Sequence, residues 1–209
     1  MFCEKFNILF IHIPKTGGKS VENYFTEFGG VFDWGMNKDL KTDRHLTLQE
    51  YYDYKILPYD VLDNTKKFTV VRNPLNKLWS QYLYEIRNVT DWNNFLYGII
   101  HNELNDSNTG SYSDLLRHVI PQHMFVDDSV EILHTETLDT DFNNFLLSNK
   151  LPIKELTREN VNIPLKDFEM ERWNHNTDLK LINDIIELYK EDFIKFGYKI
   201  PGVLSLSRA

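Results

Sequence analysis

The sequence has little of what marks several large protein classes. Its 209 residues include a single cysteine, Cys3, which excludes an internal disulfide framework and a cysteine-based metal cluster. No apolar run approaches the roughly 18 to 20 residues that span a bilayer. The first apolar run lacks the basic start and small-residue cleavage site of a secretory leader. We therefore expect a cytoplasmic protein without a transmembrane segment.

Positive charge is also scarce. The chain has 23 Lys and Arg against 31 Asp and Glu, a formal net charge of −8. Proteins that bind nucleic acid or anionic membranes usually show an excess of basic residues, so the composition speaks against both kinds of partner. Any anionic ligand must be bound by a few local cations. With 42% hydrophobic residues the chain can bury a substantial core, and we predict a single domain over residues 1–209.

Three short runs are apolar throughout rather than alternating. They cover residues 8–13, 68–71 and 130–133. Such runs are typical of strands that are covered on both faces, and helical patterns separate them. The predicted fold class is therefore α/β, with a central parallel sheet flanked by helices in three layers.

Helices are predicted from periodicity and capping signals. They cover residues 47–57, 74–88, 136–147 and 177–197, the last of them capped by Thr177 and ended by Gly197. Thr47 and Glu50 have the spacing of a capping box. Asn73 followed by Pro74 fits an N-cap and a first helical residue. The segment 91–112, rich in Asn and Asp, is expected to be a variable or mobile loop.

A strand-like run leads into a glycine-rich loop in the segment NILFIHIPKTGGKSVENYF, residues 7–25. An ATP-binding P-loop, GxxxxGK[ST], would need glycine where this chain has Ile13. A β-branched side chain resists the positive φ angles that glycine permits, so the pattern fails there. What remains is a strand, a Gly17-Gly18 turn and a helix N-terminus. These features predict an anion site with Lys15 beside it.

A second cationic position follows the next predicted strand, in FTVVRNPLNKLWSQYLYEIRN, residues 68–88. Arg72 ends the strand and supplies a planar fork for phosphate. Ser80, on the following helix, faces roughly the same side as the helix entrance and supplies a hydroxyl donor. Parallel sheets bind ligands at the carboxyl ends of their strands, so both positions could serve one doubly anionic molecule.

The two loops resemble those of a known family. HIPKTGGKS is similar to the 5′-phosphosulfate loop, and VVRNPLNKLWSQY to the 3′-phosphate loop, of sulfotransferases that use 3′-phosphoadenosine 5′-phosphosulfate (PAPS). The likeness is greatest to the carbohydrate group with the heparan sulfate (uronosyl) 2-O-sulfotransferases and chondroitin 4-O-sulfotransferases. It extends through RHLTLQEYY, IPQHMFV, EILHTETL and LYKEDFIKFGY. The resemblance implies a fold related to P-loop kinases.

The resemblance also implies roles for these residues. PAPS would be the donor and 3′-phosphoadenosine 5′-phosphate (PAP) the product, with no metal. Lys15 would stabilise the leaving phosphate, and Arg72 with Ser80 would bind the 3′-phosphate. The residues that would hold the 5′-phosphosulfate are Lys15, Thr16, Gly17, Gly18, Lys19 and Ser20. Lys19 replaces the family's usual Thr, and it would either add charge at the phosphate or point to solvent.

His45 is the predicted general base for in-line transfer. It precedes Thr47, the predicted N-cap, and the positive helix end should favour an uncharged imidazole that can accept a proton. In the resembling 2-O-sulfotransferases a histidine of the corresponding segment acts as base. His12, inside a strand pattern, is interpreted instead as a hydrogen-bonded structural residue.

Two other functions stay open at this point. The first is a P-loop kinase acting on a small molecule or nucleotide, and the second is a non-catalytic relative that binds nucleotide or glycan. For the sulfotransferase, the expected acceptor is a hydroxyl compound, above all a carbohydrate. Polysaccharide, glycolipid, glycoprotein sugar and small alcohol all fit, and the sequence leaves the oligomeric state open.

Overall fold

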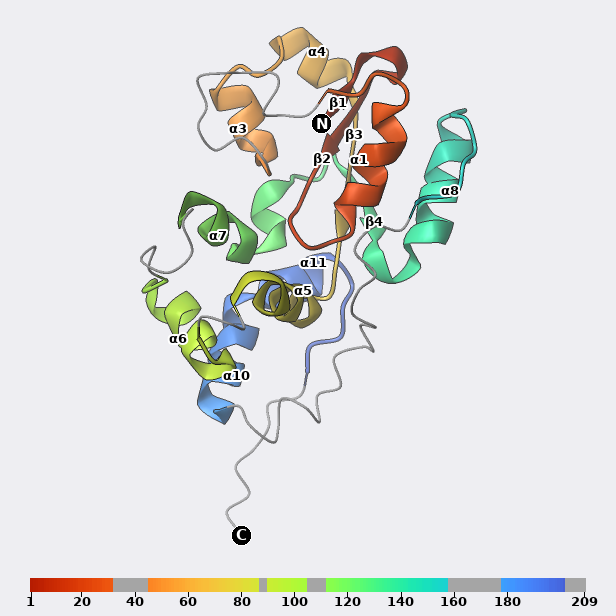
Figure 1. Cartoon of the computed structure of the whole chain (residues 1–209). Coiled ribbons are helices and arrows are strands. Elements are labelled where there is room, and N and C mark those ends of the chain that lie inside the picture. Colours follow the sequence, from red (N-terminus) through yellow and green to blue (C-terminus); the bar gives the residue numbers. More distant parts are fainter. Residues whose placement is uncertain (32–44, 87–89, 105–111, 158–177, 202–209) are drawn as a thin grey trace. The chain divides into compact units, whose positions relative to one another are not determined.

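The computed structural model describes residues 1–31, 45–86, 90–104, 112–157 and 178–201 (Figure 1). The chain divides into two compact units. The first comprises Met1–Arg72 and Met124–Ile163, and the second comprises Asn73–His123 and Pro164–Ala209. Each unit has its own cluster of buried hydrophobic side chains. The single domain over residues 1–209 stays a prediction.

The first unit contains a four-stranded sheet of order β1-β2-β3-β4. Its strands are β1 (Phe2–Cys3), β2 (Ile8–Ile11), β3 (Lys66–Val71) and β4 (Glu131–His134). β2, β3 and β4 are parallel, and β1 pairs antiparallel with β2. The α/β class and the three predicted strands are thus confirmed. Because the three strands are parallel, their carboxyl ends lie at the same edge of the sheet.

The helices of this unit are α1 (Gly18–Thr26), α3 (Leu48–Asp53), α4 (Tyr59–Asn64) and α8 (Leu138–Ser148). The predicted capping box is confirmed, because Thr47 and Glu50 each accept a hydrogen bond from the other's backbone N–H. α3 ends before residue 57. Lys55 adopts a left-handed φ of 52°, and the N–H of Ile56 bonds the carbonyl of Tyr51, which closes the helix in a Schellman motif.

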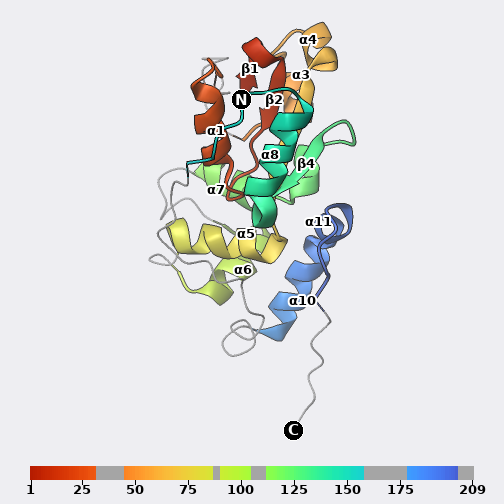
Figure 2. The ribbon, with the colours of Figure 1, turned by 90° about the vertical axis from the view of Figure 1, so that its right-hand side faces the viewer.

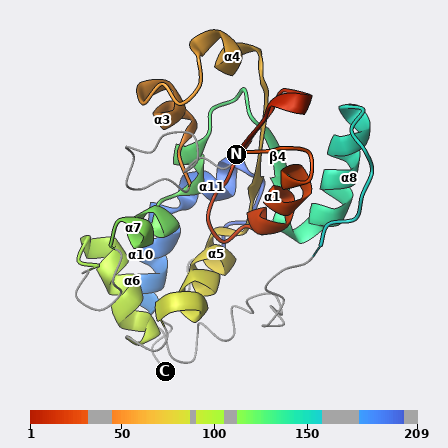
Figure 3. The same ribbon diagram turned by 45° about the horizontal axis from the view of Figure 1, so that its top comes forward.

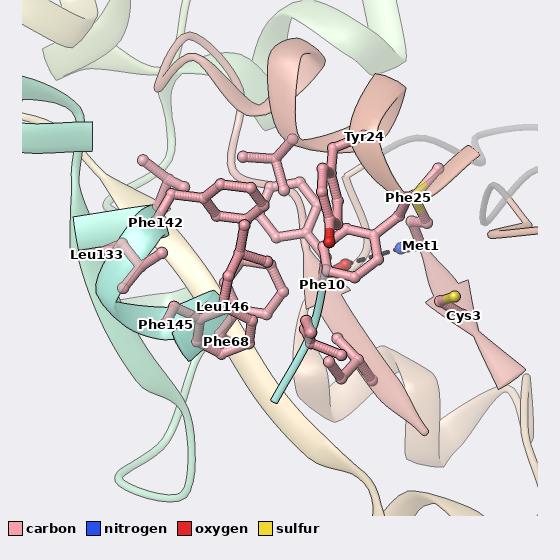
Figure 4. Close-up of a cluster of buried hydrophobic side chains, with 14 residues drawn as sticks. Met1, Cys3, Phe10, Tyr24, Phe25, Phe68, Leu133, Phe142, Phe145 and Leu146 are labelled. Atoms are coloured by element: carbon pink, nitrogen blue, oxygen red, sulfur yellow. Dashed lines mark hydrogen bonds between the residues drawn. The ribbon is translucent and has the colours of Figure 1, made fainter. Parts of the chain in front are cut away.

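One face of the sheet carries the aromatic core of the first unit, against which α1 and α8 pack (Figure 2, Figure 4). The rings of Phe10 on β2 and Phe68 on β3 stack with their centroids 5.0 Å apart. The ring centroid of Phe145 on α8 lies 4.3 Å from that of Phe68. Phe25 on α1 and Phe142 on α8 meet edge-on. Burying a Phe side chain stabilises a fold by about 1.5–3 kcal/mol. This packing fixes α1 against β2 and so fixes the loop between them.

The second unit is helical among its described residues. It contains α5 (Pro74–Gln81), a π-helical turn (Tyr82–Ile86), α6 (Trp92–His101), α7 (Tyr112–Val119), α10 (Leu179–Leu188) and α11 (Lys190–Lys195). α6 lies beside α10 (Figure 3). The predicted N-cap Asn73 is confirmed, since its side chain accepts from the N–H groups of Leu75 and Asn76. Residues 87–88 of the helix predicted there lie outside the described residues.

Two predictions about this unit were wrong. The segment 91–112 is not a loop throughout, because α6 occupies its first half. Asp91 caps that helix by accepting a hydrogen bond from the N–H of Asn94. The polar residues of this segment therefore cap the helix or lie on its solvent-exposed face. The last helix is interrupted at the fully buried Tyr189, whose hydroxyl donates to the carbonyl of Val119. Asp178 caps α10, and Thr177 lies outside the described residues.

None of the helices in the described part of the chain has the length and apolar character needed to cross a membrane.

A lysine is fully buried in the second unit. The Nζ of Lys77 on α5 donates to the carbonyl of His118, 2.6 Å away at the end of α7, and lies 3.4 Å from the carbonyl of Ile120. Burial lowers the pKa of Lys77 to about 8, although the charge of Asp192 acts in the opposite direction. The lysine thus binds carbonyl groups that the helix end would otherwise leave unpaired.

Lys77 should make the stability of this unit depend on pH. The pKa of Lys77 is about 8 in the folded chain and has its ordinary value of 10.5 in the unfolded chain. At a pH between these two values, the unfolded chain holds the lysine proton and the folded chain does not. The free energy of unfolding should therefore rise with pH in that window. In denaturant unfolding at pH 7 to 10, the wild type should gain stability over Lys77→Met as pH rises. Lys190→Met, at an exposed position, should follow the wild-type curve, and parallel curves for Lys77→Met would contradict the assignment.

Candidate active site

The loop between β2 and α1 contains two residues with left-handed backbone conformations. Lys15 has a φ of 65° and Gly17 a φ of 88°, and Gly17 is the N-cap of α1. Glycine adopts such angles at no steric cost, whereas a lysine in this region is uncommon and is held there by its surroundings. The predicted tight turn is thus located at Gly17.

Side chains from the two neighbouring strand ends bind the carbonyl groups of this loop. Arg72, which directly follows β3, donates from Nη1 to the carbonyl oxygen of Lys15 at 3.2 Å. Thr135, which directly follows β4, has its Oγ1 2.6 Å from the carbonyl oxygen of Thr16 and 2.9 Å from that of Val71. A hydroxyl has one hydrogen and donates to one of these oxygens at a time. The loop is therefore tied to the ends of both other parallel strands.

Two further carbonyl contacts lie within the loop and the first turn of α1. The hydroxyl of the fully buried Thr16 donates to the carbonyl of Ile13 at 2.8 Å, and the N–H of Ser20 donates to the carbonyl of Gly17 at 3.2 Å. Carbonyl oxygens that pointed into an anion site would repel its ligand. Because the protein's own donors bind these oxygens, the loop can present N–H groups and the positive end of α1 to an anion.

Gly18 serves a different purpose from Gly17. Its φ is not left-handed, but a Cβ at this position would lie 2.5 Å from Nε2 of His12 and closer still to Cδ2. Phe10 packs against the same ring in a stacked arrangement at 5.5 Å. The second glycine of the loop is therefore needed to admit the imidazole of His12 beside the start of α1.

His45 lies at this same place, linked to the loop through His12. Its Nδ1 is 2.9 Å from the backbone carbonyl of His12, and the two imidazole rings meet edge-on at 4.5 Å. A carbonyl oxygen only accepts hydrogen bonds, so Nδ1 of His45 must carry the proton. In the neutral ring the lone pair is then on Nε2, and that nitrogen can accept a proton.

Lys19 is the predicted site residue whose role was open. Its Nζ lies 3.7 Å from Oε2 of Glu22, one turn further along α1, and its side chain is 47% exposed. The other carboxylate oxygen of Glu22 is 2.7 Å from Nδ1 of His12. The charge of Lys19 is thus partly directed at a carboxylate of the protein itself.

The structure brings most predicted site residues together in the first unit. These are Lys15, Thr16, Gly17, Gly18, Lys19, Ser20, His45 and Arg72, all on or beside the loop. Ser80 lies on α5 in the second unit, and its pairing with Arg72 stays a prediction. The structure adds Thr135 and Glu22, which the sequence reasoning missed. Thr135 had a signal, because it follows the third apolar run in the way that Arg72 follows the second.

One comparison with known proteins gave a match. Residues 1–199 match the model of the sulfotransferase family, which is nearly the whole chain. The chain belongs to the sulfotransferase family. No curated protein and no solved structure matches it. The predicted sulfotransferase identity is thus confirmed, and the enzyme catalyses sulfuryl transfer.

Gly18→Ala should perturb both the stability and the site of the sulfotransferase. The new methyl group collides with the His12 ring, and such overpacking costs about 1–3 kcal/mol. Thermal unfolding should show a lower melting temperature than for wild type. In a His12→Ala background the space is vacant, so adding Gly18→Ala should cost much less. An equal loss in both backgrounds would show that the glycine is needed for another reason.

Proposed function

We propose that this sulfotransferase uses PAPS as donor and transfers its sulfuryl group to the hydroxyl of a carbohydrate. The observation that supports this most directly is the convergence of three segments on one loop. Arg72 bonds the carbonyl of Lys15, His45 bonds the carbonyl of His12, and Gly18 contacts the His12 ring. Two cations, a helix N-terminus and a proton acceptor therefore lie within one small region.

The donor set of the loop fits a phosphosulfate group. α1 is nine residues long, enough for a developed positive end, and its first turn contains no acidic residue. The N–H groups of Gly17, Gly18 and Lys19, with the hydroxyl of Ser20, would hold the 5′-phosphate, and the donor supplies the sulfuryl group when bound. The proposed relation to the P-loop kinase fold is supported by the order of the elements, in which strand β2 is followed by the glycine loop and then by α1.

Lys15 and Arg72 would supply the positive charge. Lys15 is half-buried on the loop, where its ammonium would stabilise negative charge on the leaving phosphate oxygen. Arg72 is 8% exposed and has five N–H donors, one of which bonds the Lys15 carbonyl. Its guanidinium, with the hydroxyl of Ser80, would bind the 3′-phosphate that distinguishes this donor from ATP. With these fixed cations the proposal requires no metal ion.

His45 would act as general base. Its Nε2 would take the proton of the acceptor hydroxyl as the acceptor oxygen forms a bond to sulfur and the bond between sulfur and the phosphate oxygen breaks. The electron pair of the broken bond stays on the phosphate oxygen, beside Lys15. Positioning and electrostatic stabilisation carry most of such a reaction. The hydrogen bond to the His12 carbonyl supports this role, because it holds the ring in the tautomer that a base needs.

The acceptor class rests on the likeness to carbohydrate sulfotransferases. Transfer of labelled sulfate from PAPS to a panel of glycans, glycolipids and small alcohols tests it. Incorporation into a glycan or glycolipid is the expected result. Incorporation into non-sugar alcohols alone would overturn the carbohydrate assignment while leaving the donor assignment intact.

His45→Ala should lower turnover by about 10²-fold or more, which is typical for removal of a general base. The affinity for PAP, which is adenosine 3′,5′-bisphosphate, should stay within about twofold of wild type, because the imidazole of His45 is not assigned a contact with the donor. Steady-state kinetics and calorimetry measure the two effects separately. Unchanged turnover would remove His45 from the mechanism.

Adenosine 3′,5′-bisphosphate should stabilise the enzyme in the presence of a metal chelator. At a concentration about 100 times its dissociation constant, the ligand should raise the melting temperature by roughly 5 to 10 °C. ATP should have little effect under the same conditions, because its phosphates do not match two separate sites. Equal stabilisation by ATP would instead favour a nucleoside triphosphate as the natural ligand.

A further inference from the structure

The imidazole of His12 is enclosed on several sides. Its Nδ1 is 2.7 Å from Oε1 of Glu22, one ring face stacks with Phe10, and Gly18 lies against the edge formed by Cδ2 and Nε2. The ring of His45 meets it edge-on at 4.5 Å. The side chains of His12 and Glu22 are each 13% exposed. A ring held in this way has one orientation.

Glu22 is held as a carboxylate. Burial alone would raise its pKa, but the hydrogen bond and charge of His12, with smaller effects from the N-terminal amine and Lys19, bring the net pKa below its usual value. A carboxylate only accepts hydrogen bonds, so Nδ1 of His12 carries the hydrogen that they share. The side chain of Glu22 therefore fixes both the orientation of the His12 ring and the nitrogen that bears its proton.

We propose that Glu22 and His12 are positioning residues for His45. Glu22 holds His12, and His12 holds His45, through its backbone carbonyl at Nδ1 and through its ring against the imidazole. This inference rests on the proposed role of His45 as base. It extends the catalytic apparatus from the loop into α1, to a carboxylate that touches neither donor nor acceptor.

The arrangement has an electrostatic consequence as well as a geometric one. When Nε2 of His45 takes the acceptor's proton, a positive charge appears beside the ring of His12, with the negative charge of Glu22 behind it. Among the described residues, the other groups whose charge acts on Glu22 are the N-terminal amine and Lys19 on α1, both positive. Glu22 is therefore the carboxylate that offsets the new charge, as buried carboxylates do behind catalytic histidines elsewhere.

Glu22→Gln tests the proposal because it keeps the shape of the side chain and an oxygen acceptor but removes the charge. It should lower kcat by about tenfold and leave the KM for PAPS within about twofold. The acid limb of the kcat profile should also move to lower pH, because a proton on the imidazole pair is less stabilised without the carboxylate. A purely structural role would not move this limb.

The matched control is Glu27→Gln, which neutralises another carboxylate of the same helix region. Glu27 is exposed and pairs with Lys154 at 2.6 Å, away from His12. Its substitution should change neither kcat nor the pH profile. Thermal unfolding of both variants checks that the fold is retained. If Glu22→Gln does not fold, Glu22→Asp replaces it. Its shorter side chain should lower kcat by displacing the carboxylate from His12, while the acid limb should stay near its wild-type position because the charge is kept, and an unchanged kcat would overturn the proposal.

A double-mutant cycle with His45→Ala separates this inference from the proposed function. If Glu22 acts through His45, Glu22→Gln should have little further effect on kcat once His45 is alanine. Equal tenfold losses in both backgrounds would overturn the positioning role while leaving His45 as the base. If His45→Ala alone has no effect, the base assignment fails and the positioning role fails with it.

Nitrogen-15 NMR of the imidazole side chains gives a readout without turnover. In the wild type, His45 should show a protonated Nδ1 and an unprotonated Nε2. The same tautomer should persist in His12→Ala, because that variant keeps the backbone carbonyl that binds Nδ1. The opposite tautomer in the wild type would overturn the hydrogen bond on which the positioning role rests.

Discussion

The hydrogen bond from Arg72 to the carbonyl oxygen of Lys15 is the contact on which the site depends. It joins the residue that follows β3 to the loop that follows β2, and it directs a loop carbonyl into the protein. Thr135, after β4, does the same for the carbonyl of Thr16. Parallel strands place these three chain segments at one edge, so the sheet itself is the reason that the loop can be held from two sides.

This constraint connects the core to the proposed chemistry. Phe10 and Phe68 fix β2 against β3 and anchor α1 through Phe25, so the loop begins and ends on rigid elements. Catalytic geometry is held best when its supporting residues are themselves locked by packing. The loop needs its two glycines for separate reasons: Gly17 adopts a left-handed turn, and Gly18 leaves space for the ring that bonds Glu22 and meets His45.

Much of the fold of the first unit was predictable, because its strands, helix starts and turns depend on local sequence. Apolar runs, capping residues and the glycine turn identified the parallel strands, the start of α3 and the glycine loop between β2 and α1. Features that depend on distant contacts were not predictable, such as the hydrogen bond of Thr135 to the carbonyl of Thr16 or the burial of Lys77. The prediction of a loop where α6 lies was also wrong, because the Asn and Asp residues of that segment fit both a loop and a capped helix with a polar face. Tyr189 likewise interrupts a helix whose apolar stripe continues through it.

The most direct test of the central claim changes a residue that is assigned no contact with the nucleotide. Thr135→Val keeps the side-chain volume but removes the hydroxyl that holds the loop carbonyl of Thr16. Thr137→Val is the control, because its hydroxyl bonds Asp141 instead. We predict that calorimetry will show about tenfold weaker binding of adenosine 3′,5′-bisphosphate to Thr135→Val, about 1.4 kcal/mol, and wild-type binding to Thr137→Val. Wild-type affinity in Thr135→Val would contradict the claim that these carbonyl contacts shape the anion site.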